Sequence, residues 1–316
     1  MLRISVGSFL VQAGAVVAIL STPCMAQTRS STDLHGVQVF PPDDPWNQDI
    51  ASSPVDANSA AIVNFIGPNK PLHPDFGTVY DGAPSGIPFI VVGKDQPKIP
   101  VRFDEYGQES DTGPYPIPLD APIEGGPRSN GDRHVIVLDR DAMMLYELYH
   151  AFPESGGWRA GSGAVFDLTR NSAQRPAGWT SADAAGLPIF AGLVRYDEVA
   201  AGKITHALRF TVRKSRRAYV PPALHWASSS DAQNLPPMGM RVRLRADFDV
   251  SGFPRQDQVI LTALKQYGMI VADNGSDWFI SGAPDPRWND GELGLLRRVH
   301  GRDFEVVRMT GIVTAR

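Results

Sequence analysis

Three ionisable residues lie within one apolar stretch of the chain, residues 131–150. Asp132, His134 and Glu147 interrupt two runs of Val, Ile, Leu and Tyr that flank a short charged turn. Burial of a carboxyl group disfavours its charged form, so a carboxyl inside an apolar strand tends to hold its proton. This pattern predicts acid–base chemistry in which Glu147 is the general acid.

Such groups suit the cleavage of polysaccharides. Glycoside hydrolysis needs two carboxyl groups about 5–10 Å apart, one of them protonated. The candidate partners of Glu147 are Asp132, Asp104, Glu105 and Glu124. A polysaccharide lyase would instead use a His or Tyr base and an Arg that neutralises a uronate, and Tyr149, His206 and Arg209 are available. The structural alternative is a buried ion pair between Glu147 and an arginine such as Arg133. We predict catalytic roles for Glu147, His134, Asp132 and His206.

Tryptophans in glycine-rich loops indicate where a sugar would bind. Trp158 and Trp179 lie in such loops, and Trp226 directly follows His225. A flat indole ring suits the apolar face of a sugar ring, although most tryptophans belong to the edge of a core. We predict that Trp158, Trp179, Trp226 and Arg209 bind substrate. Three others are expected to be packing anchors: Trp46, Trp278 and Trp288.

A metal site is the alternative use of the histidines. His134, His206 and His225 lie on or beside predicted strands, and three imidazoles from different strands could bind zinc, copper or iron. Asp132 or Glu147 would add a ligand. The sequence contains no short spacing such as His-x-His or His-Glu-x-x-His in support of this. We therefore expect no cofactor, with a divalent metal as the alternative.

Other patterns carry less chemistry. Ser162 lies in Ala-Gly-Ser-Gly-Ala, which departs from the Gly-x-Ser-x-Gly elbow of serine hydrolases at both ends. A stripe formed by Arg241, Arg243 and Arg245 could grip an anionic polymer, but a solvated face opposite acidic residues of a neighbouring strand explains it better. Residues 273–277, Asp-x-Gly-x-Asp, could hold calcium or form a plain turn.

The N-terminal residues predict export. Arg3 supplies a positive charge, an apolar run follows from Phe9 to Leu20, and small residues precede a cleavage site after Ala26. We interpret residues 1–26 as a signal peptide and residues 27–36 as a flexible leader. The apolar run is shorter than the roughly 20 residues of a membrane-spanning helix, so we expect a secreted or periplasmic protein that does not span a membrane.

Composition narrows the functional classes. Cys24 is the single cysteine of the 316 residues, and it lies within the predicted signal peptide, so the mature chain would be free of cysteine. That excludes disulfides, thiolate nucleophiles and cysteine-ligated zinc. Pro23 argues against lipid attachment at Cys24. The net charge of −4 gives no basis for binding nucleic acid, so a polysaccharide or another extracellular polymer is the expected partner.

The predicted elements are mainly strands. Besides the hairpin at 131–150, strands are predicted at 88–92, 99–103, 164–168, 204–212, 240–250, 269–272, 277–281 and 304–307. Helices are predicted at 56–66, 254–267 and 290–299, with two short ones within 175–203. We expect a two-sheet antiparallel sandwich with peripheral helices, or alternatively an α+β fold around one large antiparallel sheet. Residues 37–316 would form one β-rich domain, which ends in a helix–hairpin–helix segment whose hairpin joins 269–272 to 277–281.

The hairpin at 131–150 is expected at the centre of a sheet, because its strands are apolar at almost every position. The preceding residues 104–126 form a long acidic loop, of the kind that is often functional or mobile.

Several runs together resemble a family of secreted bacterial proteins of unestablished activity, found in soil-dwelling lineages. These runs are Gly131–Asp139, Pro176–Gly186, Gly192–Glu198, His206–Thr211 and Ala272–Phe279. The resemblance covers roughly residues 37–308. It implies one evolutionary unit with a secreted role and assigns no catalytic residues.

These observations favour a secreted carbohydrate-active enzyme, a hydrolase or a lyase, that works near the central hairpin. The alternatives are a non-catalytic polysaccharide-binding or adhesion protein and a histidine-ligated metalloprotein.

Overall fold

The structure is a computed structural model that describes Leu34 and residues 36–314. The predicted signal peptide and nearly all of the predicted leader lie outside the described residues. The described part is mainly β, with 27% strand against 16% helix, as the sequence predicts. Among residues 36–314, no helix combines the length and the apolar character that crossing a bilayer requires.

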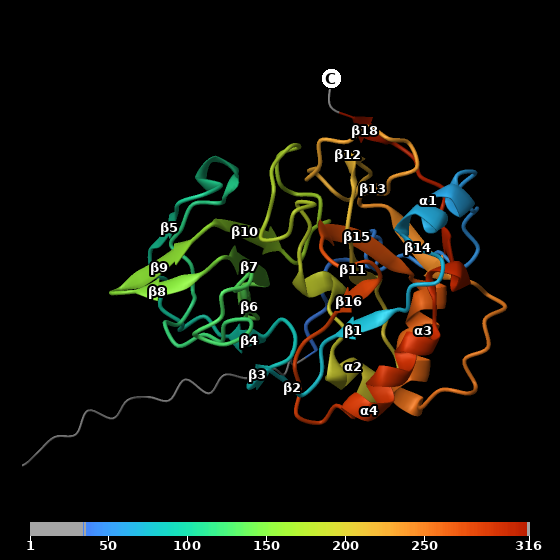
Figure 1. Ribbon diagram of the computed structural model, residues 1–316. Coiled ribbons are helices and arrows are strands. Elements are labelled where there is room, and N and C mark those ends of the chain that lie inside the picture. Colours follow the sequence, from blue (N-terminus) through green and yellow to red (C-terminus); the bar gives the residue numbers. More distant parts are fainter. Residues whose placement is uncertain (1–33, 35, 315–316) are drawn as a thin grey trace, which may run out of the picture.

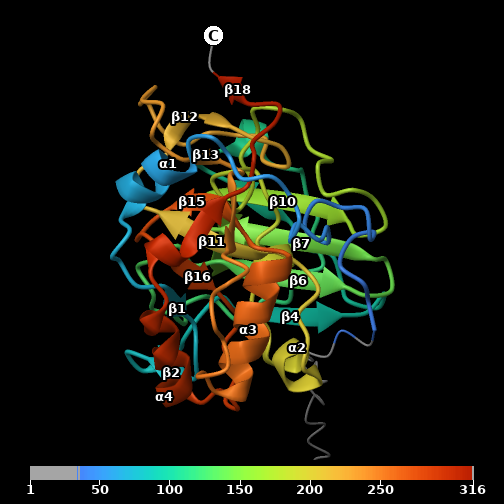
Figure 2. The ribbon, with the colours of Figure 1, turned by 90° about the vertical axis from the view of Figure 1, so that its right-hand side faces the viewer.

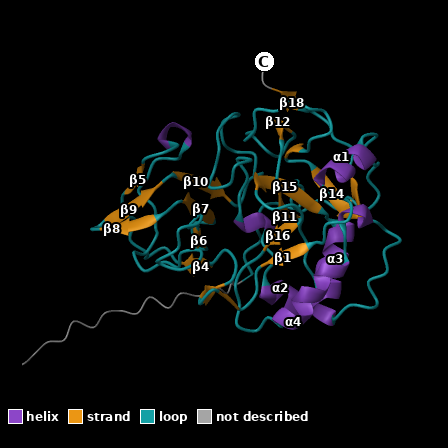
Figure 3. Ribbon diagram, in the orientation of Figure 1, coloured by secondary structure: helices purple, strands orange, loops and turns teal. Residues whose placement is uncertain are grey.

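The largest sheet is a curled, six-stranded half-barrel of mixed parallel and antiparallel strands. In spatial order its strands are β1 (His73–Asp75), β16 (Phe279–Ser281), β11 (Leu208–Val212), β15 (Met269–Asn274), β14 (Arg241–Leu244) and β17 (Phe304–Val306). The helices gather on the side of the molecule that holds this sheet (Figure 1, Figure 3). They are α1 (Ser59–Ile66), α2 (Tyr196–Ala201), α3 (Arg255–Gln266) and α4 (Asp290–Leu293).

A second sheet contains the predicted hairpin. Its four strands are β10 (Ser162–Asp167), β7 (Met144–Tyr149), β6 (Val135–Asp139) and β4 (Phe89–Val92). The β6–β7 hairpin occupies its centre, as its apolar sequence predicts, and the sheet stands beside the half-barrel (Figure 2). Both faces are covered. Leu138 and Leu145 belong to the main core, whereas Val137 and Leu148 belong to a smaller core on the other face.

Three small sheets complete the β structure: β5 (Val101–Phe103), β9 (Gly157–Ala160) and β8 (Phe152–Glu154); β12 (Arg216–Tyr219), β13 (Pro237–Met238) and β18 (Val313–Thr314); and the hairpin of β2 (Val79–Tyr80) and β3 (Ala83–Pro84). The short 3₁₀ helices are η1 (Gly107–Glu109), η2 (Phe190–Gly192), η3 (Gly294–Arg298) and η4 (Gly301–Asp303).

The structure corrects three expectations about the sheets. The described residues show no two-sheet antiparallel sandwich, and parallel pairs such as β4–β6 and β11–β15 make the sheets mixed. Strands β15 and β16 are not a hairpin, because β11 lies between them and pairs with both. The strand predicted at 240–250 ends at Leu244, because its antiparallel neighbour β17 begins opposite that residue, at Phe304.

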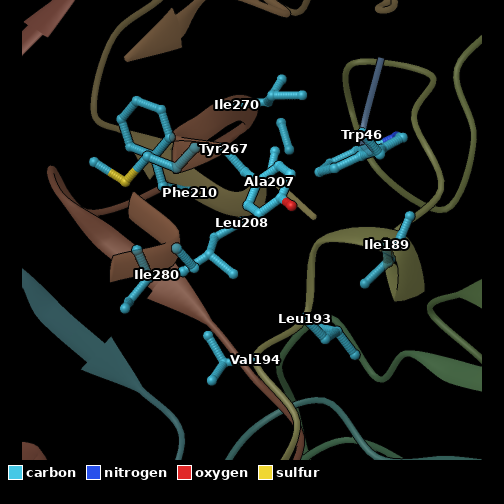
Figure 4. Close-up of a cluster of buried hydrophobic side chains, with 14 of the residues drawn as sticks. Trp46, Ile189, Leu193, Val194, Ala207, Leu208, Phe210, Tyr267, Ile270 and Ile280 are labelled. Atoms are coloured by element: carbon cyan, nitrogen blue, oxygen red, sulfur yellow. The ribbon is translucent and has the colours of Figure 1, made fainter. Parts of the chain in front are cut away.

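The main core joins the half-barrel to the segment that leads into α2. Leu193 and Val194 of this segment lie near Leu208 of β11 in the cluster of Figure 4. Gly192 allows the close approach, because a Cβ there would lie 2.6 Å from the Cβ of Arg209. The predicted packing anchors, Trp46, Trp278 and Trp288, are all buried.

Candidate functional site

Two adjoining cavities form a cleft between the four-stranded sheet and the half-barrel. Their volumes are about 340 Å³ and 190 Å³, and Asp132, Asp273 and Asn274 line both of them. Asp132 precedes β6, whereas Asp273 and Asn274 end β15. The cleft thus lies where the loop before the central hairpin meets one end of the half-barrel.

The loop that carries Asp132 and His134 is held by the arginine between them. Arg133 has a left-handed backbone, with φ of +53°, which is uncommon for a residue other than glycine. Its guanidinium donates hydrogen bonds to three backbone carbonyls, those of Pro127, Ser129 and Ala151, at 2.7–3.0 Å. Arg133 therefore fixes its two neighbours and does not pair with Glu147, contrary to the structural alternative considered for that residue.

A β-bulge sets the position of Asp273. Along the β11–β15 pair, Phe210 faces Val271 but Thr211 faces Asp273, so Ala272 is an extra residue in β15. The extra carbonyl is satisfied, because it accepts a hydrogen bond of 2.9 Å from the amide of Ala185. Bulges often re-aim a side chain near an active site. Here the bulge precedes the carboxyl group that lines both cavities.

A buried ion pair lies beside this carboxyl group. Arg209 binds Asp183 through two hydrogen bonds of 2.7 Å and 2.8 Å, and it also donates to the hydroxyl of Ser281. Burial alone would lower the pKa of Arg209, but the carboxylate of Asp183 raises it, so the guanidinium stays charged. The guanidinium nitrogen Nη2 of Arg209, which donates to Asp183, also lies 3.8 Å from Oδ2 of Asp273.

Burial raises the pKa of Asp273 to about 7, and the charge of Asp183 adds to this effect, while Arg209 opposes it. Asp132 contributes a further, smaller repulsion. The side chain of Asp273 keeps 26% of its accessible surface. It is therefore a carboxyl group that can hold a proton near neutral pH and still meet a ligand.

A second carboxyl group lies against His134. The backbone amide of Glu124 donates to the carbonyl of His134, and the amide of His134 donates back to the carboxylate of Glu124. The two side chains approach to 3.9 Å. Burial raises the pKa of Glu124, and His134 partly opposes this. Nδ1 of His134 is buried without a hydrogen-bond partner among the described residues.

The predicted general acid does not reach the cleft. Glu147 is fully buried in β7, and its two carboxylate oxygens accept hydrogen bonds of 2.9 Å and 2.8 Å from the backbone amides of Ile189 and Phe190. Burial raises its pKa to about 8, although the two amides oppose this. It lines neither of the two cavities, so its contacts join the central hairpin to the η2 segment.

The predicted histidines are dispersed. His206 is buried outside both cavities. Its Nε2 lies 3.1 Å from the carboxylate of Glu198, and its Nδ1 lies 2.8 Å from the carbonyl of Ala207. His225 lines the wider cavity and lies 2.7 Å from the carbonyl of Ala184. Within the described part of the chain, no group of three or more His, Cys, Asp or Glu side chains is arranged to hold a metal ion. The proposed three-histidine site therefore has no structural support.

The tryptophans also differ from expectation. Trp158 is buried in the smaller core, because residues 157–160 form strand β9 and not a glycine-rich loop. Trp179 is half-buried, and its ring lies 5.5 Å from the guanidinium of Arg175. Trp226 is half-buried and stacks on Tyr219. None of the three lines the cleft.

The arginine stripe is structural. Arg241 binds three backbone carbonyls, and Arg243 pairs with Glu305 of the neighbouring strand at 2.7 Å. An acidic residue therefore lies opposite the stripe, as expected, but the expected solvated face is wrong, because Arg243 is buried and Arg241 is half-buried. In residues 273–277, Asp277 pairs with Lys70 while Asp273 lines the cleft, so the two carboxyls serve different contacts.

The structure brings together two of the predicted catalytic residues, Asp132 and His134. It also places in the cleft Glu124, one of the carboxyl groups predicted as a partner of Glu147, and it adds three residues for which no catalytic role was predicted: Asp75, Asp183 and Asp273. Asp273 lies in a run whose spacing suggested a calcium site or a plain turn, and nothing in that run signals a general acid. The acidic composition of residues 104–126 is the one signal that pointed toward Glu124.

The chain was compared with protein-family models, with curated proteins and with solved structures, and none of the three comparisons gave a significant match.

Proposed function

We propose that this protein is a secreted glycoside hydrolase that cleaves a neutral polysaccharide, with Asp273 as the general acid and Asp132 as the base. The observation that carries this proposal is the convergence of the two carboxyl groups, from segments far apart in the sequence, on the wall shared by two cavities. Glycoside hydrolysis uses such a pair, one protonated and one ionised.

The proposed reaction balances with one water molecule. Asp273 donates its proton to the glycosidic oxygen as the bond to the anomeric carbon breaks. Asp132 takes a proton from the water that attacks that carbon, and proton exchange with solvent restores both groups. A pKa of about 7 for Asp273, caused by burial and by Asp183, suits an acid that works near neutral pH.

The charges favour hydrolysis of a neutral chain over a lyase reaction on a polyuronate. The smaller cavity is lined by four carboxyl groups, those of Asp75, Glu124, Asp132 and Asp273. Arg209 also lines it, but its charge is already matched by Asp183. An anionic polymer would therefore be repelled, and the arginine that we considered for neutralising a uronate is occupied.

The wider cavity presents groups that suit sugar hydroxyls. Tyr106, Tyr149, His225 and Asn274 contribute hydroxyl, imidazole and amide groups to its wall. Such groups both donate and accept hydrogen bonds, as a sugar hydroxyl does. They support a polyhydroxylated ligand more than an apolar one.

The test is the release of reducing ends from mixed-linkage β-glucan, xylan and galactomannan, with polygalacturonate as an anionic comparison. We expect turnover of a neutral polymer and a loss of about 10²- to 10⁴-fold in kcat for Asp273→Asn, the usual contribution of a general acid. The wild-type rate should fall as the pH rises through about 7, where Asp273 loses its proton.

Asp247→Asn is the matched control, because this aspartate is 77% exposed and lies outside both cavities. It should leave the rate unchanged. Thermal unfolding would show whether each variant folds. The proposal is wrong if no polymer is cleaved, or if folded Asp273→Asn retains the wild-type rate.

A further inference from the structure

A third cavity extends the cleft on the side of the β2–β3 hairpin. Its volume is about 650 Å³, and it shares Asp75, Glu124 and Phe279 with the smaller cavity of the candidate site. The two cavities are therefore contiguous. The proposed reaction uses no residue of this extension, so its size and shape need a separate explanation.

The lip of this cavity is an exposed aromatic hairpin. Tyr80 and Val79 of β2 line the cavity and are 78% and 63% exposed, the largest exposed fractions among the large apolar side chains of the described residues. Asp81 and Gly82 both have positive φ, as in the tight two-residue turn that Asp-Gly favours. In Figure 1 the hairpin lies at the lower edge of the molecule, between the four-stranded sheet and the half-barrel.

The hairpin is anchored at its base. The carboxylate of Asp290, at the start of α4, accepts hydrogen bonds from the backbone amide and the hydroxyl of Thr78. The amide of Gly77 donates to the carbonyl of Ser85 at 3.0 Å, which closes the base of the hairpin. These contacts hold Tyr80 beside the cavity although the hairpin joins no larger sheet.

The opposite wall combines a flat aromatic surface with polar groups. The rings of His73 and Phe279 stack at 3.9 Å, and Arg297 donates to Nδ1 of His73 at 3.3 Å. Burial, followed by the charge of Arg297, lowers the pKa of His73, so its ring is neutral at pH 7. A wall of this kind suits a ligand that has apolar faces and a hydroxylated rim.

We propose that this cavity binds further sugar units of the same neutral polysaccharide, with Tyr80 as a stacking surface, so that the protein holds a chain that continues past the cleavage point. This inference rests on the proposed function for the identity of the ligand. A cavity of 650 Å³ that adjoins the cleft provides the space, and the aromatic lip provides the contact for a sugar face.

The test separates binding from cleavage. Migration through native gels that contain mixed-linkage β-glucan, xylan or galactomannan is measured for Asp273→Asn, which binds without cleaving. At least one polymer should retard this variant. Adding Tyr80→Ala should weaken the apparent affinity about tenfold, whereas adding Tyr80→Phe should preserve it, because the ring is kept.

Phe65→Ala is the matched control, since Phe65 is an exposed aromatic residue of α1 that lies outside these three cavities. It should not change retardation. The inference is wrong if no polymer retards the protein, or if Tyr80→Ala binds as tightly as its parent. Tyr80-dependent retardation without any release of reducing ends would overturn the proposed function alone, and cleavage without Tyr80 dependence would overturn this inference alone.

Discussion

Glu147 and Asp273 both lie on strands. Burial raises the pKa of each carboxyl group, to about 8 for Glu147 and to about 7 for Asp273. The two residues differ in the number of backbone amides that donate to the carboxylate and in the exposure of the side chain. Glu147 is fully buried and accepts from two backbone amides, whereas Asp273 accepts from one, that of Asn274, and keeps 26% of its side-chain surface. A raised pKa therefore indicates that a carboxyl group is buried. Only its access to a ligand in the cleft distinguishes a candidate general acid from a carboxyl group with a structural role.

The two positions in their sheets explain the difference. Glu147 lies in a central strand, where the neighbouring segment supplies amide donors to both of its oxygens. Asp273 follows a bulge near the end of β15, where the strand meets the cleft. A strand end leaves room for a ligand that the middle of a covered sheet cannot provide.

The largest expected effect on stability comes from breaking the ion pair between Arg209 and Asp183, which lies near the carboxyl groups of both Glu147 and Asp273. Replacing Arg209 by Met leaves Asp183 buried and unpaired, which should lower the free energy of unfolding by about 3–5 kcal/mol in urea denaturation. The double variant Arg209→Met with Asp183→Asn should recover part of this loss. An Arg209→Met protein as stable as wild type would show that the pair does not support the cleft.

The next effect concerns Glu147 itself. Glu147→Gln should lower the free energy of unfolding by about 1–3 kcal/mol, because the amide nitrogen of Gln cannot accept from Ile189 or Phe190. The kcat of the folded variant should stay within about twofold of wild type, because Glu147 does not line the cleft.

The exposed Glu154→Gln is the control, with an expected change of about 0.5 kcal/mol or less in the same denaturation series. A Glu147→Gln variant with wild-type stability and a greatly reduced kcat would reverse the comparison between Glu147 and Asp273. Glu147 would then be the catalytic acid, as the sequence analysis predicted.

The sequence predicted the local elements more reliably than their neighbours. The apolar runs located β6 and β7 and their central position, and the helix predicted at 254–267 is α3. Which strands pair is a non-local property. Nothing in residues 269–281 reveals that β11 inserts between β15 and β16.

The site was predicted in part for the same reason. Asp132 and His134 stood out because they interrupt an apolar run, and the structure places both in the cleft. Glu147 interrupts a run as well, but its amide partners come from a segment about forty residues away. Asp273 depends on a bulge, and a bulge is visible only when the partner strand is known.

An effect that appears only at high pH tests whether burial alone is enough to raise a pKa. Asp257 of α3 is fully buried, and neither carboxylate oxygen has a hydrogen-bond partner among the described residues. Burial raises its pKa to about 7 from an ordinary value of 3.8. A carboxyl group with a raised folded-state pKa favours folding at low pH, and this contribution is lost as the pH rises from about 4 to about 7.

Asp257→Asn, which is neutral at every pH, should therefore match wild type near pH 4 and exceed its free energy of unfolding by up to about 4 kcal/mol at pH 8, because each pKa unit corresponds to about 1.4 kcal/mol. Urea denaturation at the two pH values measures this difference, and the exposed Asp247→Asn should show none. An equal pH dependence in wild type and Asp257→Asn would mean that Asp257 stays ionised. Burial would then not be enough to hold a proton, and the raised pKa of Asp273 would need a cause besides burial.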